Sequence, residues 1–197
     1  LINLRPTFTR YYMRSHIDLE LPENEQIDRR QLFLLSAFAG ILSKQLNLSE
    51  VNIKLLFLLA KHRYPRVRQS VYEQCAVLPW PCSQQLILEG LQNETQQAVR
   101  LTLIKQLADP RFSEHQQGFK VWQQQLIATA SFAEKRLLLE LSPRIMFNLQ
   151  VDCHTEQQAN SLFKSFVEFL NQRLEDEPSL AIRRIISRVR EQLVSFM

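Results

Sequence analysis

The sequence predicts an all-α protein in which antiparallel helix pairs stack into a short right-handed α-solenoid. Apolar residues recur at steps of three and four along most of the chain, which places them on one face of a helix. Glycine occurs only 3 times and the chain has no Asn-Gly or Asp-Gly dipeptide, so tight β-hairpins have little support. Val67 and Val99 lie 32 residues apart and head similar segments, a period typical of helix-pair repeats.

The chain divides into an irregular N-terminal segment, residues 1–27, and a single helical-repeat domain, residues 28–197. Pro6 and Pro22 punctuate the first part. The first residue is Leu1 rather than Met, so we expect the domain to be part of a longer protein. The longest apolar run, residues 32–42, is about half of the roughly 20 residues that a membrane span needs, so no membrane partner is expected.

The first expected helix begins at Asp28, a residue suited to the N-cap, and runs to about residue 46. Its apolar stripe is Leu32, Leu35, Phe38, Ala39, Leu42 and Leu46. Ser49 is suited to cap the next helix, over 51–63, which ends near Arg63 because Pro65 disfavours α geometry at Tyr64. Its partner, over 66–78, buries Val67, Val71, Cys75 and Leu78.

Prolines and polar residues also bound the remaining pairs. Two prolines place Trp80 in a connection, after which Ser83 is suited to cap a helix over 83–92 and Asn93 one over 94–108. The third pair is 116–129 with 132–148, interrupted at Pro143. Thr155 opens the fourth pair, 157–174 with 178–196, in which Pro178 takes a favoured first helical position.

Three of the second helices begin alike, with a β-branched residue followed by arginine. The segments are Pro65-Arg66-Val67-Arg68, Gln97-Ala98-Val99-Arg100 and Pro178-Ser179-Leu180-Ala181-Ile182-Arg183. This pattern resembles the HEAT-repeat family of α-solenoids (a HEAT/ARM-like arrangement) over about residues 50–197. In that family an acid in the turn of a pair precedes a Val-Arg step, and the two help to lock neighbouring repeats.

The resemblance implies inter-repeat structural roles for Arg100, Arg183 and Asp176. Asp176 or Glu177 stands before Arg183, and Asn93 or Glu94 before Arg100. The first pair has His62 and Arg63 at this place instead of an acid, and the third pair has Glu134-Lys135-Arg136 without the Val-Arg step.

No motif indicates catalysis, a cofactor or a metal. Cys75 and Cys82 stand seven residues apart, whereas paired zinc ligands usually stand two to four apart, and Cys75 belongs to an apolar stripe. Cys153-His154 falls in a turn. Phosphate-binding glycine loops and a Gly-x-Ser-x-Gly elbow are missing from the sequence. We therefore expect a protein without enzymatic activity, cofactor or metal.

The arginines are the candidate binding residues, because they outnumber the lysines 17 to 7 in a chain of net charge +4. A cluster at 63–68 occupies a helix start, where the helix dipole disfavours positive charge, and has no acid nearby in the sequence. If the pairs stack in parallel, Arg68, Arg100 and Arg183 share one ridge, which could bind phosphates or form inter-repeat salt bridges. The candidate partner-binding or nucleic-acid-binding residues are Arg63, Arg66, Arg68, Trp80, Arg184 and Arg188.

The expected function is a scaffold for protein–protein interaction within a larger intracellular complex, since three cysteines without framework spacing favour a reducing compartment. The alternative is a nucleic-acid-binding protein that uses an arginine-rich face. A third interpretation is an enzyme similar to the DNA-repair glycosylases of the HEAT superfamily, which use exposed tryptophans with an aspartate in a concave cleft. The sequence places no such aspartate near Trp80 or Trp122, and Trp122 lies on an apolar face.

Overall fold

The computed structural model describes residues 37, 40, 50–112, 117–151 and 153–195, and within them all regular structure is helical. The all-α prediction is therefore confirmed. The helices are α3 (Glu50–Ala60), α4 (Pro65–Glu73), α5 (Trp80–Asn93), α6 (Gln97–Gln106), α7 (Gln117–Ala128), α8 (Phe132–Val151), α9 (Glu156–Asp176) and α10 (Leu180–Val194). Single 3-10 turns occupy Cys75–Val77 and Pro110–Phe112. The N-terminal segment 1–27 and most of the helix expected from Asp28 lie outside the described residues.

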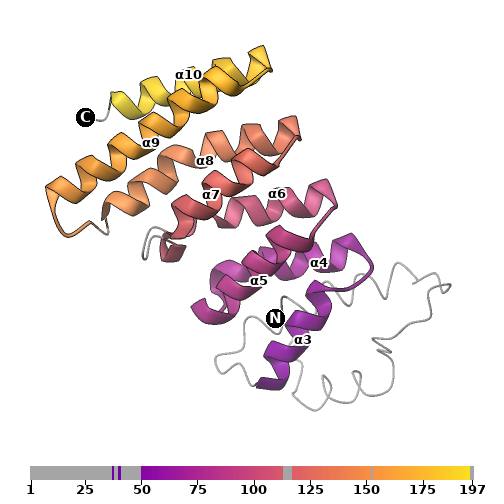
Figure 1. Cartoon of the computed structure of the whole chain (residues 1–197). Coiled ribbons are helices and arrows are strands. Elements are labelled where there is room, and N and C mark those ends of the chain that lie inside the picture. Colours follow the sequence, from indigo (N-terminus) through magenta and orange to yellow (C-terminus); the bar gives the residue numbers. More distant parts are fainter. Residues whose placement is uncertain (1–36, 38–39, 41–49, 113–116, 152, 196–197) are drawn as a thin grey trace.

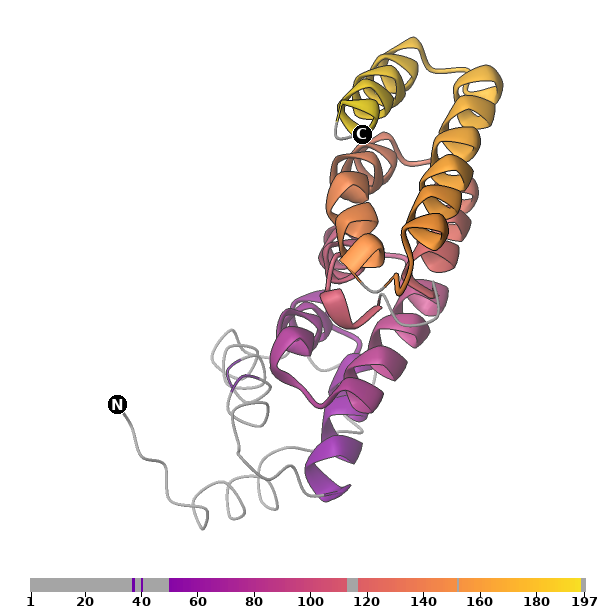
Figure 2. The ribbon, with the colours of Figure 1, turned by 90° about the vertical axis from the view of Figure 1, so that its left-hand side faces the viewer.

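The helices form two layers. Each odd-numbered helix is followed, after a short connection, by an antiparallel partner, giving the pairs α3–α4, α5–α6, α7–α8 and α9–α10 (Figure 1). The second helices pack in sequence, with α4 against α6, α6 against α8 and α8 against α10. Figure 2 shows the two layers side by side along the molecule, with the α9–α10 pair at one end. The four predicted pairs are all present, with shifted ends.

The core fills the space between the two layers. The second helices contribute Val67, Val99, Leu138 and Ile182, all buried. Trp122 of α7 is fully buried as predicted, and its Nε1 donates a hydrogen bond to the Leu138 carbonyl at 2.8 Å. Its ring stacks on Phe166 of α9 with the centroids 4.7 Å apart, so aromatic packing joins the third pair to the fourth.

Several predicted helix ends are wrong. The helix α5 begins at Trp80 instead of Ser83, because proline is tolerated in the first helical turn and Pro81 does not interrupt it. Ser83 is buried inside α5, and its Oγ donates to the Cys75 carbonyl at 2.7 Å. Asn93 ends α5 instead of capping α6. The predicted cap at Thr155 is confirmed, because its Oγ1 accepts from the Gln158 backbone amide at 3.2 Å.

Two further prolines behave differently from the prediction. The helix α8 continues through Pro143 to Val151. Pro178 lies before α10, whose N-cap is Ser179, and the Ser179 Oγ accepts from the Ile182 amide at 3.4 Å. Tertiary packing of a long apolar face outweighs the local cost of a proline in α8.

Gly90 lets α5 approach both α4 and α6. A Cβ at this position would lie 2.8 Å from Leu103 Cδ2 and 2.9 Å from Tyr72 Cζ. Any larger residue would push these side chains apart.

Among the helices of the described residues, none has an apolar stretch of the length that a membrane crossing needs.

Candidate partner-binding surfaces and the ion pairs between helix pairs

One charged contact recurs between successive helix pairs. The fourth residue of α4, α6 and α8 is Arg68, Arg100 and Lys135, and each pairs with a glutamate of the following pair. Arg68 Nε lies 2.6 Å from Glu94 Oε2, Arg100 Nε lies 3.0 Å from Glu134 Oε2, and Lys135 Nζ lies 2.7 Å from Glu177 Oε2. We call these three contacts the ionic ladder.

Two of the ladder glutamates also satisfy backbone amides before a helix. Glu94 lies in the turn between α5 and α6, and its Oε1 accepts from the amides of Thr95 at 3.0 Å and Gln96 at 2.8 Å. Glu177 lies in the equivalent turn before α10, and its Oε1 accepts from the Ser179 amide at 3.1 Å. A carboxylate is favoured here because amides at a helix start lack helical partners and carry partial positive charge.

The ladder arginines also bind the turn of their own pair. Arg68 Nη1 donates to the carbonyls of His62 at 2.7 Å and Arg63 at 3.0 Å. Arg100 Nη1 donates in the same way to the carbonyls of Leu91 at 3.1 Å and Glu94 at 3.2 Å. A guanidinium has five donors in a fixed plane, so one side chain can fix its own turn and a neighbouring carboxylate together.

These contacts lower the pKa of the Glu94 and Glu177 carboxyls. Burial alone would raise the pKa of Glu94, but hydrogen bonds from Arg68 and from the Gln96 and Thr95 amides hold that pKa below its ordinary value. The Glu177 carboxyl behaves in the same way, since Lys135 and the Ser179 amide outweigh its burial and lower its pKa. Both groups therefore favour the folded state in their charged form.

The free energy of unfolding should fall in acid for this reason. A carboxyl with a lower pKa in the folded state stabilises the fold fully above about pH 5, and this contribution disappears as the pH falls through the lowered pKa. Urea unfolding of the chain at a series of pH values should show this decline. Glu94→Gln should reduce its slope, whereas Glu168→Gln, at an exposed carboxylate 4.0 Å from Lys164, should preserve it. An unchanged slope in Glu94→Gln would contradict the prediction.

The ladder corrects the interpretation of Arg68. The sequence shows no acid near the 63–68 cluster, yet the stack brings Glu94, 26 positions away, into a two-bond contact with Arg68. Only 14% of the Arg68 side chain is exposed. Arg63 and Arg66 are exposed beside it, with Arg63 lying over the Tyr64 ring and Arg66 Nη1 3.5 Å from Gln69 Oε1.

The three residues with an expected inter-repeat role, Arg100, Asp176 and Arg183, differ in their contacts. Arg100 contacts the next pair through Glu134. The inter-pair role expected for Asp176 falls to Glu177, because Asp176 lies 4.0 Å from Arg173 within α9. Arg183 is exposed, and within the described residues it makes no ion pair with Asp176 or any other acid.

The third contact of the ladder, between Lys135 and Glu177, does not follow from the Val-Arg pattern, because Glu134-Lys135-Arg136 lacks that step. A comparison of the four second-helix starts would have found the contact, since each has a basic residue at its fourth position. Charge at a fixed helical position, and not the Val-Arg dipeptide, is what recurs here.

The candidate residue Trp80 packs against two neighbouring side chains and stays partly exposed. Its half-buried ring contacts Phe112 edge-on at 4.7 Å, and the Arg111 guanidinium lies over the ring at 4.9 Å. Arg111 also donates to the Leu78 carbonyl at 2.8 Å and pairs with Asp109 at 2.6 Å. These contacts clamp the 3-10 turn before Trp80 onto the turn after α6.

The Trp80 cluster bears on the glycosylase interpretation. The structure places an aspartate, Asp109, near Trp80, which the sequence did not predict. Both carboxylate oxygens of Asp109 accept hydrogen bonds from Arg111, at 3.0 and 2.6 Å. Burial alone would raise the Asp109 pKa, but Arg111 outweighs it and lowers that pKa. Both oxygens of this carboxylate therefore hold the Arg111 side chain that contacts Trp80.

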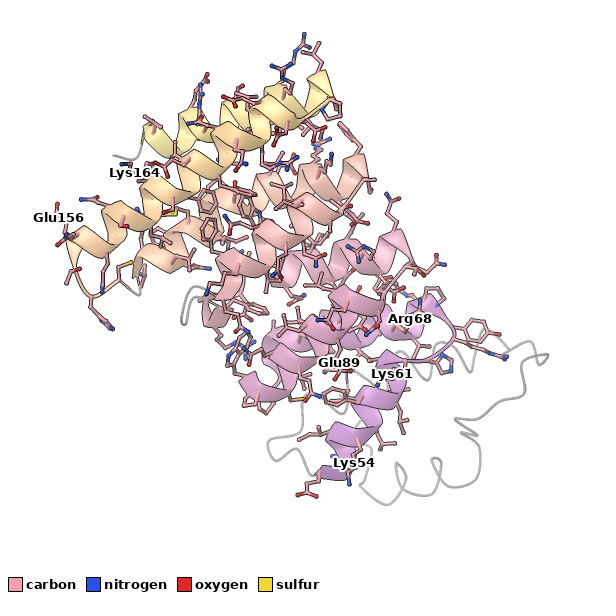
Figure 3. All side chains as sticks on the ribbon, in the orientation of Figure 1. Lys54, Lys61, Arg68, Glu89, Glu156 and Lys164 are labelled. Atoms are coloured by element: carbon pink, nitrogen blue, oxygen red, sulfur yellow. The ribbon has the colours of Figure 1, made fainter. Side chains whose placement is uncertain are left out.

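Two hollows lie near the first and the fourth helix pairs. The first, of about 520 Å³, lies between the α3–α4 turn and the end of α5, and Lys61 and Glu89 approach each other there at 3.7 Å (Figure 3). The second, of about 500 Å³, lies on α10 beside the end of α9 and is lined by Leu174, Leu180, Arg183, Arg184, Ser187, Arg188 and Glu191. The candidates Arg184 and Arg188 therefore lie in a groove together with Arg183, whereas Arg63 lines the first hollow.

No group of three histidine, cysteine, aspartate or glutamate side chains suited to a metal ion occurs among the described residues. Cys75 lies in the core, and burial raises the pKa of its thiol to about 12. Comparisons with protein-family models, with curated proteins and with solved structures found no match to this chain.

Proposed function

We propose that this chain is a HEAT-like helical-repeat scaffold that binds a protein partner within a larger intracellular complex. The observation that carries the proposal is the ionic ladder. The same position of three consecutive second helices is cationic and reaches a glutamate of the next pair. A contact that recurs with the helix pair is what a repeat architecture requires, because each unit must recognise its neighbour.

An array of this kind suits recognition because its outer surfaces extend along the stack. The α3–α4 turn presents Arg63 and Arg66, and α8 presents Phe147 and Val151 one helical turn apart, 64% and 68% exposed. Arginine and aromatic residues are enriched at protein–protein interfaces. These exposed groups are the surfaces that a partner could contact.

The charge distribution favours a protein over a nucleic acid as the partner. A duplex-binding track needs several cations in a row to engage successive phosphates. The ridge of Arg68, Arg100 and Lys135 is a row of cations, but Glu94, Glu134 and Glu177 neutralise it. The cations that remain exposed at Arg63 and Arg66 are few and local.

Affinity capture with the whole chain tests the proposal. Wild-type chain should retain a specific protein partner, and Arg63→Glu with Arg66→Glu should lose it without loss of helicity. Arg68 stays unchanged because it belongs to the ladder. Lys105→Glu with Lys164→Glu is the matched control, since it makes the same charge change at exposed positions. Equal capture by the two double variants would refute a role for the α3–α4 turn.

A salt titration against a random DNA duplex separates the alternative. Binding that weakens by orders of magnitude between about 50 and 200 mM salt would indicate engagement of six or more phosphates. The scaffold proposal expects weak binding to the duplex even at the lower salt concentration.

A further inference from the structure

The second helix of the fourth pair, α10, repeats the cationic position of the ladder, and no acid among the described residues pairs with it. Arg183 is the fourth residue of α10, as Arg68, Arg100 and Lys135 are of α4, α6 and α8. Each of those three meets a glutamate from the following pair. Arg183 is exposed, and within the described residues it makes no ion pair or side-chain hydrogen bond. Arg183 is therefore placed to form an equivalent ion pair with a carboxylate from outside the described residues.

The groove around Arg183 has the chemistry of an anion-binding surface with an apolar margin. Arg184 and Arg188 are exposed in the same groove, and neither makes an ion pair with a described residue. Leu180, 63% exposed, and Leu174 of α9 form its apolar part. Its lining carries three guanidiniums against a single carboxylate, that of Glu191.

The eighth residue of the second helices differs between α10 and the three preceding pairs. The eighth residue of the first three second helices is Tyr72, Ile104 and Leu139, and all three are buried. In α10 the eighth residue is Ser187, which is partly exposed. Another helix pair packed as the inner ones are would meet a small hydroxyl side chain at this point instead of a large buried one. In α10 the fourth residue, Arg183, is still cationic, whereas the eighth, Ser187, is no longer a large buried residue.

We propose that the α10 groove binds an acidic segment of a partner protein. A carboxylate of that segment pairs with Arg183 in the way that Glu94 pairs with Arg68. The proposal rests on the scaffold function and assigns it a second surface and a partner chemistry. Charge disfavours a second copy of this chain, because the turn of the first described pair, α3–α4, carries His62 and Arg63. The leucines and Glu191 disfavour a phosphate backbone.

A binding measurement with defined probes tests the groove. The probes are a fluorescein-labelled helical peptide with glutamates and leucines at steps of three and four on adjoining faces, the same peptide with every glutamate replaced by glutamine, and a single-stranded oligonucleotide of equal charge. Fluorescence anisotropy with the full chain should show binding of the glutamate peptide and at least about tenfold weaker binding of the glutamine peptide, a difference of about 1.4 kcal/mol.

Two matched double variants locate the site. Arg183→Glu with Arg184→Glu should abolish binding of the glutamate peptide, whereas Lys105→Glu with Lys164→Glu, of equal net charge at exposed positions, should preserve it. Unchanged binding in the α10 variant, or equal loss in both, would overturn the proposal. Tighter binding of the oligonucleotide through Arg183 and Arg184 would also overturn it. None of these results depends on the α3–α4 turn, so the scaffold proposal stands or fails by its own capture experiment.

Discussion

Replacement of Glu94 by glutamine should destabilise the fold by about 3 kcal/mol, the lower end of the cost of breaking a buried ion pair by removal of one partner. Only 3% of the Glu94 side chain is exposed, and its two oxygens accept from Arg68 at 2.6 and 2.8 Å. Glutamine has nearly the same shape but no charge, and its NH₂ group cannot accept a hydrogen bond. The Arg68 guanidinium would remain in a largely buried position without its counter-ion.

Urea unfolding monitored by circular dichroism measures this effect. Glu89→Gln is the matched control, because Glu89 belongs to the same helix pair and forms an exposed contact with Lys61 at 3.7 Å (Figure 3). Exposed pairs are worth about 0–1 kcal/mol, so the control should lose much less stability. Equal losses in Glu94→Gln and Glu89→Gln would show that the ladder contact contributes no more to the free energy of unfolding than an ordinary surface ion pair.

Replacement of Trp122 by alanine should cost about 3–5 kcal/mol, the range for truncation of a large buried aromatic residue. Trp122 is fully buried and packs against Phe119, with the ring centroids 5.9 Å apart, and against Phe166 and Phe169 of α9, at 4.7 and 5.4 Å. The change would also leave the Leu138 carbonyl without its indole donor. Because these rings join α7 to α9, the last two pairs should lose contact with each other before the first pairs unfold.

Hydrogen exchange resolved by residue checks this order of unfolding. Amides of α9 and α10 should lose protection in Trp122→Ala, while those of α4 to α6 should retain most of theirs. Ile127→Ala is the control on the same helix, because Ile127 is 58% exposed and should change stability by about 0.5 kcal/mol or less. Uniform loss of protection along the whole chain would contradict the expected order.

Apolar periodicity predicted the helix pairs, since it reports which face of a helix must be buried. It located α9 and α10 to within a few residues and placed Trp122 in the core. Helix ends were predicted less well. Ser83 and Asn93 are common caps, but the chain begins α5 at Trp80 and starts α6 after Gln96. Which of several polar residues caps a helix depends on where tertiary packing stops the neighbouring helix.

The candidate site depended on contacts that the sequence does not place close together. In the sequence Arg68 belongs to a cationic cluster, because its acid is 26 residues away. The prolines beside Trp80 predict a connection, yet Trp80 begins α5 and packs between Phe112 and Arg111. In contrast, Arg184 and Arg188 stand four residues apart and line one groove of α10, a placement that helical spacing alone gives.

The ladder binds each of the first three described helix pairs to its immediate successor. Double-mutant cycles on unfolding free energy test it most directly, with Arg68→Ala combined first with Glu94→Gln and then with Glu177→Gln. The first cycle should give a coupling energy of about 0.5–3 kcal/mol, because the two side chains are in contact, and the second should be additive within about 0.5 kcal/mol. Additivity in the first cycle, or equal coupling in both, would contradict the claim.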